Sequence, residues 1–137
     1  MRKVAPSLIG MPLLWLIDDT PSLHVVAEAT VRLVSGWSFF GHFTGEEALA
    51  EYEHLTAEAR PNVILMDYYI GAERGDEVTA QVLMLASAQH RPVIIGYSSV
   101  RSGSAAIVAA GADLMLPKRS NAAGINPDLL SYLRRWT

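Results

Sequence analysis

Residues 63–76 read "VILMDYYIGAERGD", which joins an apolar segment, a single carboxylate at Asp67 and a polar, glycine-rich continuation. Consecutive large apolar residues without alternation are typical of a strand buried on both faces, as in a parallel sheet. An acid directly after such a strand lies at the carboxyl end of the sheet, where open α/β folds bind their ligands. The stretch therefore predicts both a parallel sheet and a candidate site at Asp67.

Apolar segments of the same kind recur along the chain, with helical patterns between them. We expect strands at residues 12–18, 37–43, 62–67, 92–98 and 113–118, and helices at residues 22–36, 44–59, 75–89, 102–111 and 126–137. Thr44 and Glu47 form a capping box, and Asn126 with Pro127 gives a helix cap and first turn. This alternation predicts an α/β domain of the (βα)5 type, in which right-handed crossovers place all strand carboxyl ends at one edge.

Composition narrows the class of protein. Half of the 137 residues are hydrophobic and 18% are charged, which is typical of one globular domain, and no apolar run reaches the length of a membrane span. The absence of cysteine excludes disulfides and thiolate metal sites, and a net charge of -3 argues against direct binding of nucleic acid. We expect a lead-in at residues 1–11, a single domain at 12–137, no membrane association and a cytoplasmic location.

Polar side chains end four of the five predicted strands. They are Asp18 and Asp19, then Asp67, then Ser98 with Ser99, and finally Lys118. Three carboxylates at one edge repel one another, so a cation is needed to keep them ionised. Oxygen ligands alone favour Mg²⁺, and Mg²⁺ with a lysine suits a phosphoryl group, which an aspartate can accept as an acyl phosphate.

Two enzyme classes fit the sequence poorly. The segment "GYSSV" at 96–100 approaches a serine nucleophile elbow, but Val100 replaces its last glycine and all four histidines precede Ser98. No glycine-rich nucleotide-binding loop follows the first strand, where "DDTPS" stands instead. We therefore expect a protein that is not an enzyme, apart from catalysing its own phosphoryl transfer and dephosphorylation.

The constellation of strand ends resembles the receiver domain of two-component response regulators, the CheY-like family. Supporting features are Gly75, eight residues after Asp67, the "TGEEAL" entry to the second helix and the "GADLMLPK" segment that ends at Lys118. The resemblance covers residues 12 to 136. It implies a doubly wound, flavodoxin-like three-layer sandwich with a parallel sheet of order 2-1-3-4-5.

The resemblance also implies roles for individual residues. Asp67 would be the phosphoacceptor and, with Asp19, a carboxylate ligand of Mg²⁺, while Asp18 would act through water. The backbone carbonyl of Tyr69 would be a further ligand. Two other residues would contact the phosphoryl group, Lys118 through its ammonium and Ser98 through its hydroxyl, with Ser99 as the second choice.

The implied partners are a sensor histidine kinase or a histidine phosphotransfer protein, which would donate the phosphoryl group from phosphohistidine. A homodimer or an effector would use the face of the fourth helix, fifth strand and fifth helix. The sequence departs from the family in its Pro117-Lys118 order, in Met115 where an aromatic is usual, and in a short segment from Ser98 to Gly111. These departures leave an alternative open, a receiver-like interaction module that works without phosphorylation.

Overall fold

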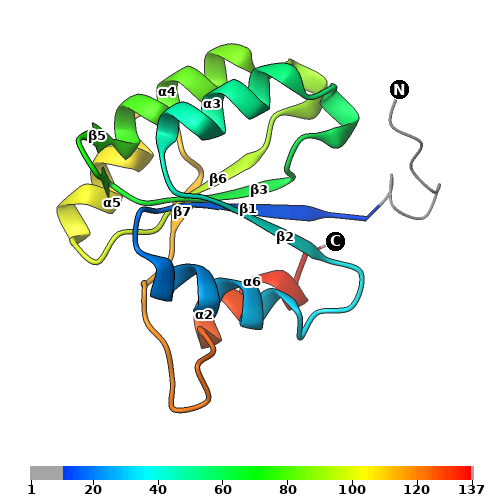
Figure 1. The fold of residues 1–137 in the computed structure, drawn as a ribbon, viewed down its shortest axis with the longest axis vertical. Coiled ribbons are helices and arrows are strands. Elements are labelled where there is room, and N and C mark those ends of the chain that lie inside the picture. Colours follow the sequence, from blue (N-terminus) through cyan, green and yellow to red (C-terminus); the bar gives the residue numbers. More distant parts are fainter. Residues whose placement is uncertain (1–10, 137) are drawn as a thin grey trace.

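A five-stranded parallel sheet forms the centre of the molecule (Figure 1). The computed structural model describes residues 11–136, so most of the expected lead-in lies outside the described residues. The sheet has the order β2-β1-β3-β6-β7, with strands at Ser38–His42, Leu13–Ile17, Val63–Met66, Val93–Gly96 and Leu114–Met115. Relabelled by their order among the predicted strands, these are 2-1-3-4-5, so the predicted topology is confirmed.

Helices cover both faces of the sheet, as Figure 1 shows. One face carries α3 (Gly45–His54), α4 (Gly75–Leu85) and α5 (Arg101–Ala109), and the other carries α2 (Pro21–Val31) and α6 (Pro127–Arg134). Each face has its own apolar core. Trp15, Ile64 and Met66 face α3, α4 and α5, whereas Leu14 and Leu65 face α2 and α6. All four side chains of β3 are fully buried, as the apolar run at 63–66 predicts.

Several helices are shorter than predicted. The helix expected at 22–36 ends at Val31, and the helices expected at 44–59 and 75–89 end early and continue as 3₁₀ turns at Ala57–Ala59 and Ala88–His90. Leu55 and Ala86, at the two helix ends, have extended backbones, with ψ of 146° and 139°. Both residues pack against the core beside α3 and α4, so tertiary packing ends the helices where propensity alone would extend them.

A small hairpin follows β3 where the sequence predicts only a loop. β4 (Tyr69–Ile70) and β5 (Glu73–Arg74) pair antiparallel around a two-residue turn. Gly71, the first residue of the turn, has a φ of 59°, whereas Ala72, the second, does not have a positive φ. A positive φ at the first turn position alone is typical of a type II′ turn. The hairpin is anchored because Ile70 is buried and Glu73 Oε1 accepts a hydrogen bond from the Gly45 backbone N–H at 2.8 Å.

The predicted helix caps are present. Thr44 Oγ1 accepts a hydrogen bond from the Glu47 N–H at 3.0 Å, and Asn126 Oδ1 accepts from the N–H groups of Asp128 and Leu129. Leu129 and Leu133 of α6 are buried against the sheet. Within residues 11–136 there is no helix with the length and apolar character needed to cross a membrane.

Candidate functional site

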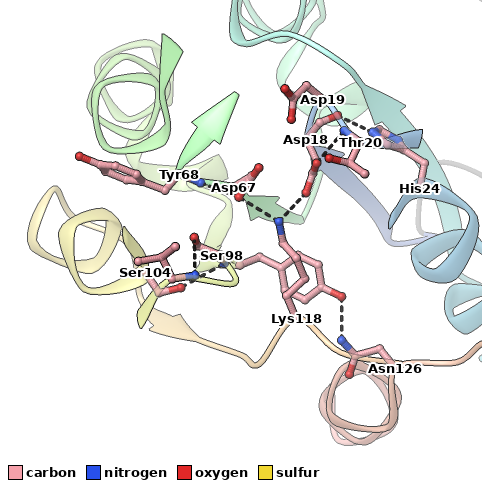
Figure 2. Close-up of polar contacts among 12 residues, drawn as sticks. Asp18, Asp19, Thr20, His24, Asp67, Tyr68, Ser98, Ser104, Lys118 and Asn126 are labelled. Atoms are coloured by element: carbon pink, nitrogen blue, oxygen red, sulfur yellow. Dashed lines mark hydrogen bonds and ion pairs between the residues drawn. The ribbon is translucent and has the colours of Figure 1, made fainter. Parts of the chain in front are cut away.

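Three acids converge at the carboxyl edge of the sheet, in the place the sequence predicts. Asp18 and Asp19 follow β1, and Asp67 follows β3. One carboxylate oxygen from each lies within 4.8 Å of the others. Figure 2 shows the two segments facing each other across this edge. The parallel pairing of β1 with β3 fixes this approach, because Ile17 is opposite Met66 and the acids come next.

Lys118 lies between two of these acids. Its Nζ is 2.8 Å from Asp18 Oδ2 and 2.9 Å from Asp67 Oδ1 (Figure 2). The lysine side chain is only 7% exposed, so these ion pairs are shielded from water. One ammonium group facing three carboxylates leaves an excess of negative charge in a partly desolvated place, and such an excess favours a further cation.

Asp18 is held rigidly and is completely buried. Its Oδ1 accepts from the Thr20 N–H at 2.9 Å, and its Oδ2 accepts from Lys118. His24 Nε2 lies 2.7 Å from the Asp18 carbonyl oxygen, and the His24 ring stacks on Phe43. Because both carboxylate oxygens are already bonded, an indirect role toward a metal suits Asp18 better than direct coordination. His24 thus helps to hold the backbone at Asp18.

Asp67 is 7% exposed and has one carboxylate oxygen in use. Its Oδ1 accepts from the Tyr68 N–H at 2.8 Å as well as from Lys118, whereas no hydrogen bond from the described residues reaches Oδ2. Burial raises the pKa of this carboxyl group, the hydrogen bond from Lys118 opposes the rise, and the Asp18 carboxylate adds to it. The free oxygen and the raised pKa show that the charge of Asp67 is incompletely compensated.

The hairpin connects Asp19 to Asp67. Asp19 is exposed, and its Oδ2 accepts from the Gly71 N–H in the hairpin turn at 3.0 Å. Gly75 closes the hairpin because its N–H donates to the Tyr68 carbonyl at 2.7 Å. A Cβ atom at position 75 would collide with the carbonyl oxygen of Asp67, so only glycine fits there. This is the physical reason for the glycine eight residues after the acid.

Ser98 and Ser99 differ in burial. Ser98 is 8% exposed, whereas Ser99 is exposed to solvent, which favours Ser98 as the predicted hydroxyl. Ser98 Oγ accepts from the Val100 N–H at 3.1 Å, and the Ser98 N–H donates to Ser104 Oγ at 3.1 Å. Ser98 follows the strand next to β3, but it makes no hydrogen bond to Asp67 or Lys118 in this structure (Figure 2).

Asn126 supports the Lys118 loop, and the sequence predicts only its helix cap. Its Nδ2 donates to Tyr97 Oη at 2.7 Å and to the Pro117 carbonyl at 3.0 Å. Asn126 is fully buried and also donates its backbone N–H to Thr30 Oγ1. No cis peptide bond occurs in residues 11–136, so the Pro117-Lys118 segment is trans. The sequence identifies Asn126 as a helix cap. Its contacts with Tyr97 and Pro117 depend on the tertiary structure and cannot be predicted from the local sequence.

The donor set fits a hard divalent cation. Carboxylate oxygens are the ligands that Mg²⁺ prefers, and Asp67 Oδ2 and the exposed Asp19 carboxylate both have capacity for one. The Tyr69 carbonyl as a third ligand stays a prediction. Met115 is exposed on the edge strand β7.

Structural comparison identifies solved proteins with the same fold over nearly the whole chain. The Vibrio cholerae chemotaxis protein CheY4 matches with a TM-score of 0.71 at 25% identity, over 92% of this chain and 98% of that one. The receiver domain of the Pseudomonas aeruginosa sensor histidine kinase PA1611, which has a magnesium ion in its active site cleft, matches with 0.71 at 23%, over 93% and 98%.

The phosphorylated cyanobacterial phytochrome response regulator RcpA matches with a TM-score of 0.71 at 16% identity, over 91% of this chain and 90% of that one. Neither a protein-family model nor a curated protein matches the sequence. The topology, the extent of the match and the agreement among several solved structures lead to one conclusion: this chain has the fold of the response regulator receiver domains.

Proposed function

We propose that this protein is a phosphorylation-dependent switch of a two-component system, with Asp67 as the phosphoacceptor. The observation that carries the proposal is the arrangement of Asp67, which has Lys118 on one oxygen, two further acids nearby and its other oxygen free of hydrogen bonds. A structural ion pair needs no third carboxylate beside it, whereas phosphoryl transfer needs both a nucleophile and cation binding.

The chemistry follows from the positions of these groups. The Asp67 carboxylate attacks the phosphorus atom of a phosphohistidine, a new O–P bond forms, and the N–P bond breaks with its electron pair going to the imidazole. Lys118, already 2.9 Å from Asp67, would neutralise the transferring oxygens. Ser98, at the end of the neighbouring strand, would donate its hydroxyl hydrogen to the phosphoryl group after a local adjustment.

Mg²⁺ bound by Asp19 and Asp67, with Asp18 acting through water and the Tyr69 carbonyl as a further ligand, would supply electrostatic stabilisation of the phosphoryl oxygens. The phosphoryl donor would be a sensor histidine kinase or a histidine phosphotransfer protein. The receiver-domain fold supports this partner class in general. The face of α5, β7 and α6 remains the proposed output surface.

The test is incubation with acetyl phosphate and Mg²⁺, followed by intact-protein mass spectrometry. The proposal predicts a gain of one phosphoryl group in the wild type, no gain with a chelator and no gain in Asp67→Asn. Asp76→Asn is the matched control, because Asp76 belongs to the same segment but pairs with Arg74. It should retain the gain.

Failure of the folded wild type to gain mass would support the alternative, an interaction module that works without phosphorylation. A gain that persists in Asp67→Asn would place the acceptor elsewhere and contradict the assignment. Circular dichroism of each variant establishes that a lost signal does not come from unfolding.

A further inference from the structure

The edge strand β2 has an open side. Among residues 11–136, β2 pairs only with β1 and forms one edge of the sheet. Exposed edges are usually protected by charged residues, proline or a covering segment. The sequence of β2, "SFFGH", contains no lysine, acid or proline, and Phe40 is 54% exposed. Within residues 11–136, this edge therefore lacks the usual features that prevent another chain from pairing with it.

The backbone of β2 offers hydrogen bonds outward at alternate residues. Ser38 donates its N–H to the Pro12 carbonyl, and the His42 carbonyl accepts from Asp18, so both residues face β1. The N–H and C=O groups of one strand residue point to the same side, and neighbouring residues point to opposite sides. Phe39 and Gly41 consequently direct their N–H and C=O groups away from the sheet, where an added strand can bond to them.

A groove follows this edge between β2 and α3. It consists of two hollows of 610 and 430 Å³ that share Phe40 and Glu51 as lining residues. Trp15 and Leu55 contribute apolar surface to the smaller hollow, and Phe43 to the larger. The groove is thus apolar beside the strand that offers free backbone groups.

The outer rim of the groove is acidic. Glu47 and Glu51 line the larger hollow, and Glu51 and Glu58 line the smaller. Residues 45–59 contain five glutamates and neither lysine nor arginine. Arg60 also lines the smaller hollow, but its guanidinium donates to the carbonyls of Tyr52 and Leu85 and lies over the Tyr52 ring. A ligand here meets negative charge above an aromatic surface.

We propose that the β2–α3 groove binds an extended basic segment of a partner protein, which adds a strand to β2. Its backbone would bond to Phe39 and Gly41. Alternate arginine or lysine side chains on the α3 side would lay their apolar stems over Phe40 and place their charges beside Glu51 and Glu58. This surface shares no residue with the acid site, and the proposal does not depend on phosphorylation.

Charge selects this partner over two others. A second copy pairing through β2 would bring the same glutamates of both α3 helices toward one groove, and like charges oppose such a dimer. A nucleic acid would be repelled by the same rim. A basic polypeptide complements the negative charge of the glutamates and can form hydrogen bonds with the free backbone groups of β2.

The probe is the peptide acetyl-Arg-Val-Arg-Val-Arg-Val-Arg-amide, titrated into full-length protein without phosphodonor and followed by amide NMR. We expect shift changes centred on β2 and α3 and slower hydrogen exchange at the Phe39 and Gly41 amides. A Glu-Val peptide of the same length should not bind. A peptide with N-methyl groups on its β2-facing amides should bind at least about tenfold more weakly, since two backbone bonds are lost.

Protein variants locate the contact. Glu51→Gln with Glu58→Gln should weaken binding about fivefold, the effect of losing two exposed ion pairs, and Phe40→Thr should weaken it further. Glu46→Gln with Glu53→Gln is the matched control, since it removes the same amount of charge from α3, outside the groove, and should leave affinity unchanged. Equal weakening by both pairs, no binding, or shifts that map elsewhere would overturn the proposal. So would slow exchange at Phe39 and Gly41 before peptide is added, because another segment or copy would already cover the edge.

Discussion

Asp67 combines two properties that a purely structural acid has no reason to combine. It is buried against Lys118 and Asp18, yet one of its oxygens makes no hydrogen bond with the described residues. Burial raises its pKa despite the lysine, so holding this group as an anion costs folding free energy. A buried carboxylate with one free oxygen destabilises the folded state, but it is available to react or to bind a cation.

Asp67→Asn should therefore stabilise the protein at neutral pH, because the variant removes the cost of keeping this buried group ionised. The folded pKa is above the unfolded one, so the folded state binds the proton more tightly and the penalty exists only where the carboxyl is ionised. The advantage of the variant should shrink as the pH falls through the raised pKa and vanish below the ordinary carboxyl range. Urea unfolding at several pH values measures this. An Asn variant less stable than wild type at pH 7 would contradict it.

Two glycines of the hairpin segment should respond differently to alanine. Gly75→Ala places a Cβ against the Asp67 carbonyl and should cost about 2–4 kcal/mol, because backbone must move. Gly71 has open space around it, so Gly71→Ala should cost only about 1 kcal/mol, from its φ of 59°. Thermal unfolding of the pair checks this order, and equal losses would show that the close approach at residue 75 is not the cause.

At the scale of elements, Asn126 joins α6 to the loop that carries Lys118. Its Oδ1 caps the helix while its Nδ2 holds Tyr97 and the Pro117 carbonyl. The loop thus keeps its shape through a side chain from the following helix.

Substitutions at position 126 can separate these roles. Asn126→Ala should lose about 2–4 kcal/mol of stability. Asn126→Ser should regain about 1 kcal/mol by restoring the cap, but it is too short to reach Tyr97 and Pro117. Both variants lose the contacts that hold the Lys118 loop, so both should gain the phosphoryl group more slowly than the wild type. The rate in the Ser variant should be as low as in the Ala variant. Recovery of that rate with the cap alone would show that Asn126 does not position Lys118.

The local sequence pattern predicts strands well where several consecutive residues are buried, and poorly where a strand has only two residues. The runs at 63–66 and 94–95 are buried on both faces, so their apolar character identifies them without tertiary information. The strands at Tyr69–Ile70 and Glu73–Arg74 are too short for any periodicity, and only the glycine at the first turn position indicates them. Helix ends at Leu55 and Ala86 depend on core contacts, which no local pattern contains.

For the whole molecule, a divalent cation bound at the acid site would raise the stability of the folded state. If Mg²⁺ binds the folded site alone, stability should rise by about 2.7 kcal/mol at a concentration one hundred times the dissociation constant. The gain should be much smaller in Asp67→Asn and should fall at acidic pH as the carboxylates are protonated. Differential scanning calorimetry across a Mg²⁺ series measures it, with Asp76→Asn as the control that retains the wild-type response. An unchanged melting temperature in the wild type would contradict metal binding.

The molecule also shows why part of the site escapes sequence reasoning. Asp18, Asp67 and Lys118 are predictable because parallel strands bring their carboxyl ends to one edge. The supports from His24, Ser104 and Asn126 come from helices packed on the sheet or from a helix cap, and their local sequence does not reveal these contacts. Residues that depend on topology follow from the strand pattern, whereas those that depend on packing require coordinates.

In the proposed switch, Asp67 itself carries the phosphoryl group. Treating the acetyl phosphate product with borohydride reduces an acyl phosphate to an alcohol, so tandem mass spectrometry can identify the modified residue. We expect homoserine at residue 67 in the Mg²⁺-treated wild type, with aspartate unchanged at residues 18, 19 and 76. Homoserine at another acid, or unreduced aspartate at residue 67 in protein that has gained a phosphoryl group, would contradict it.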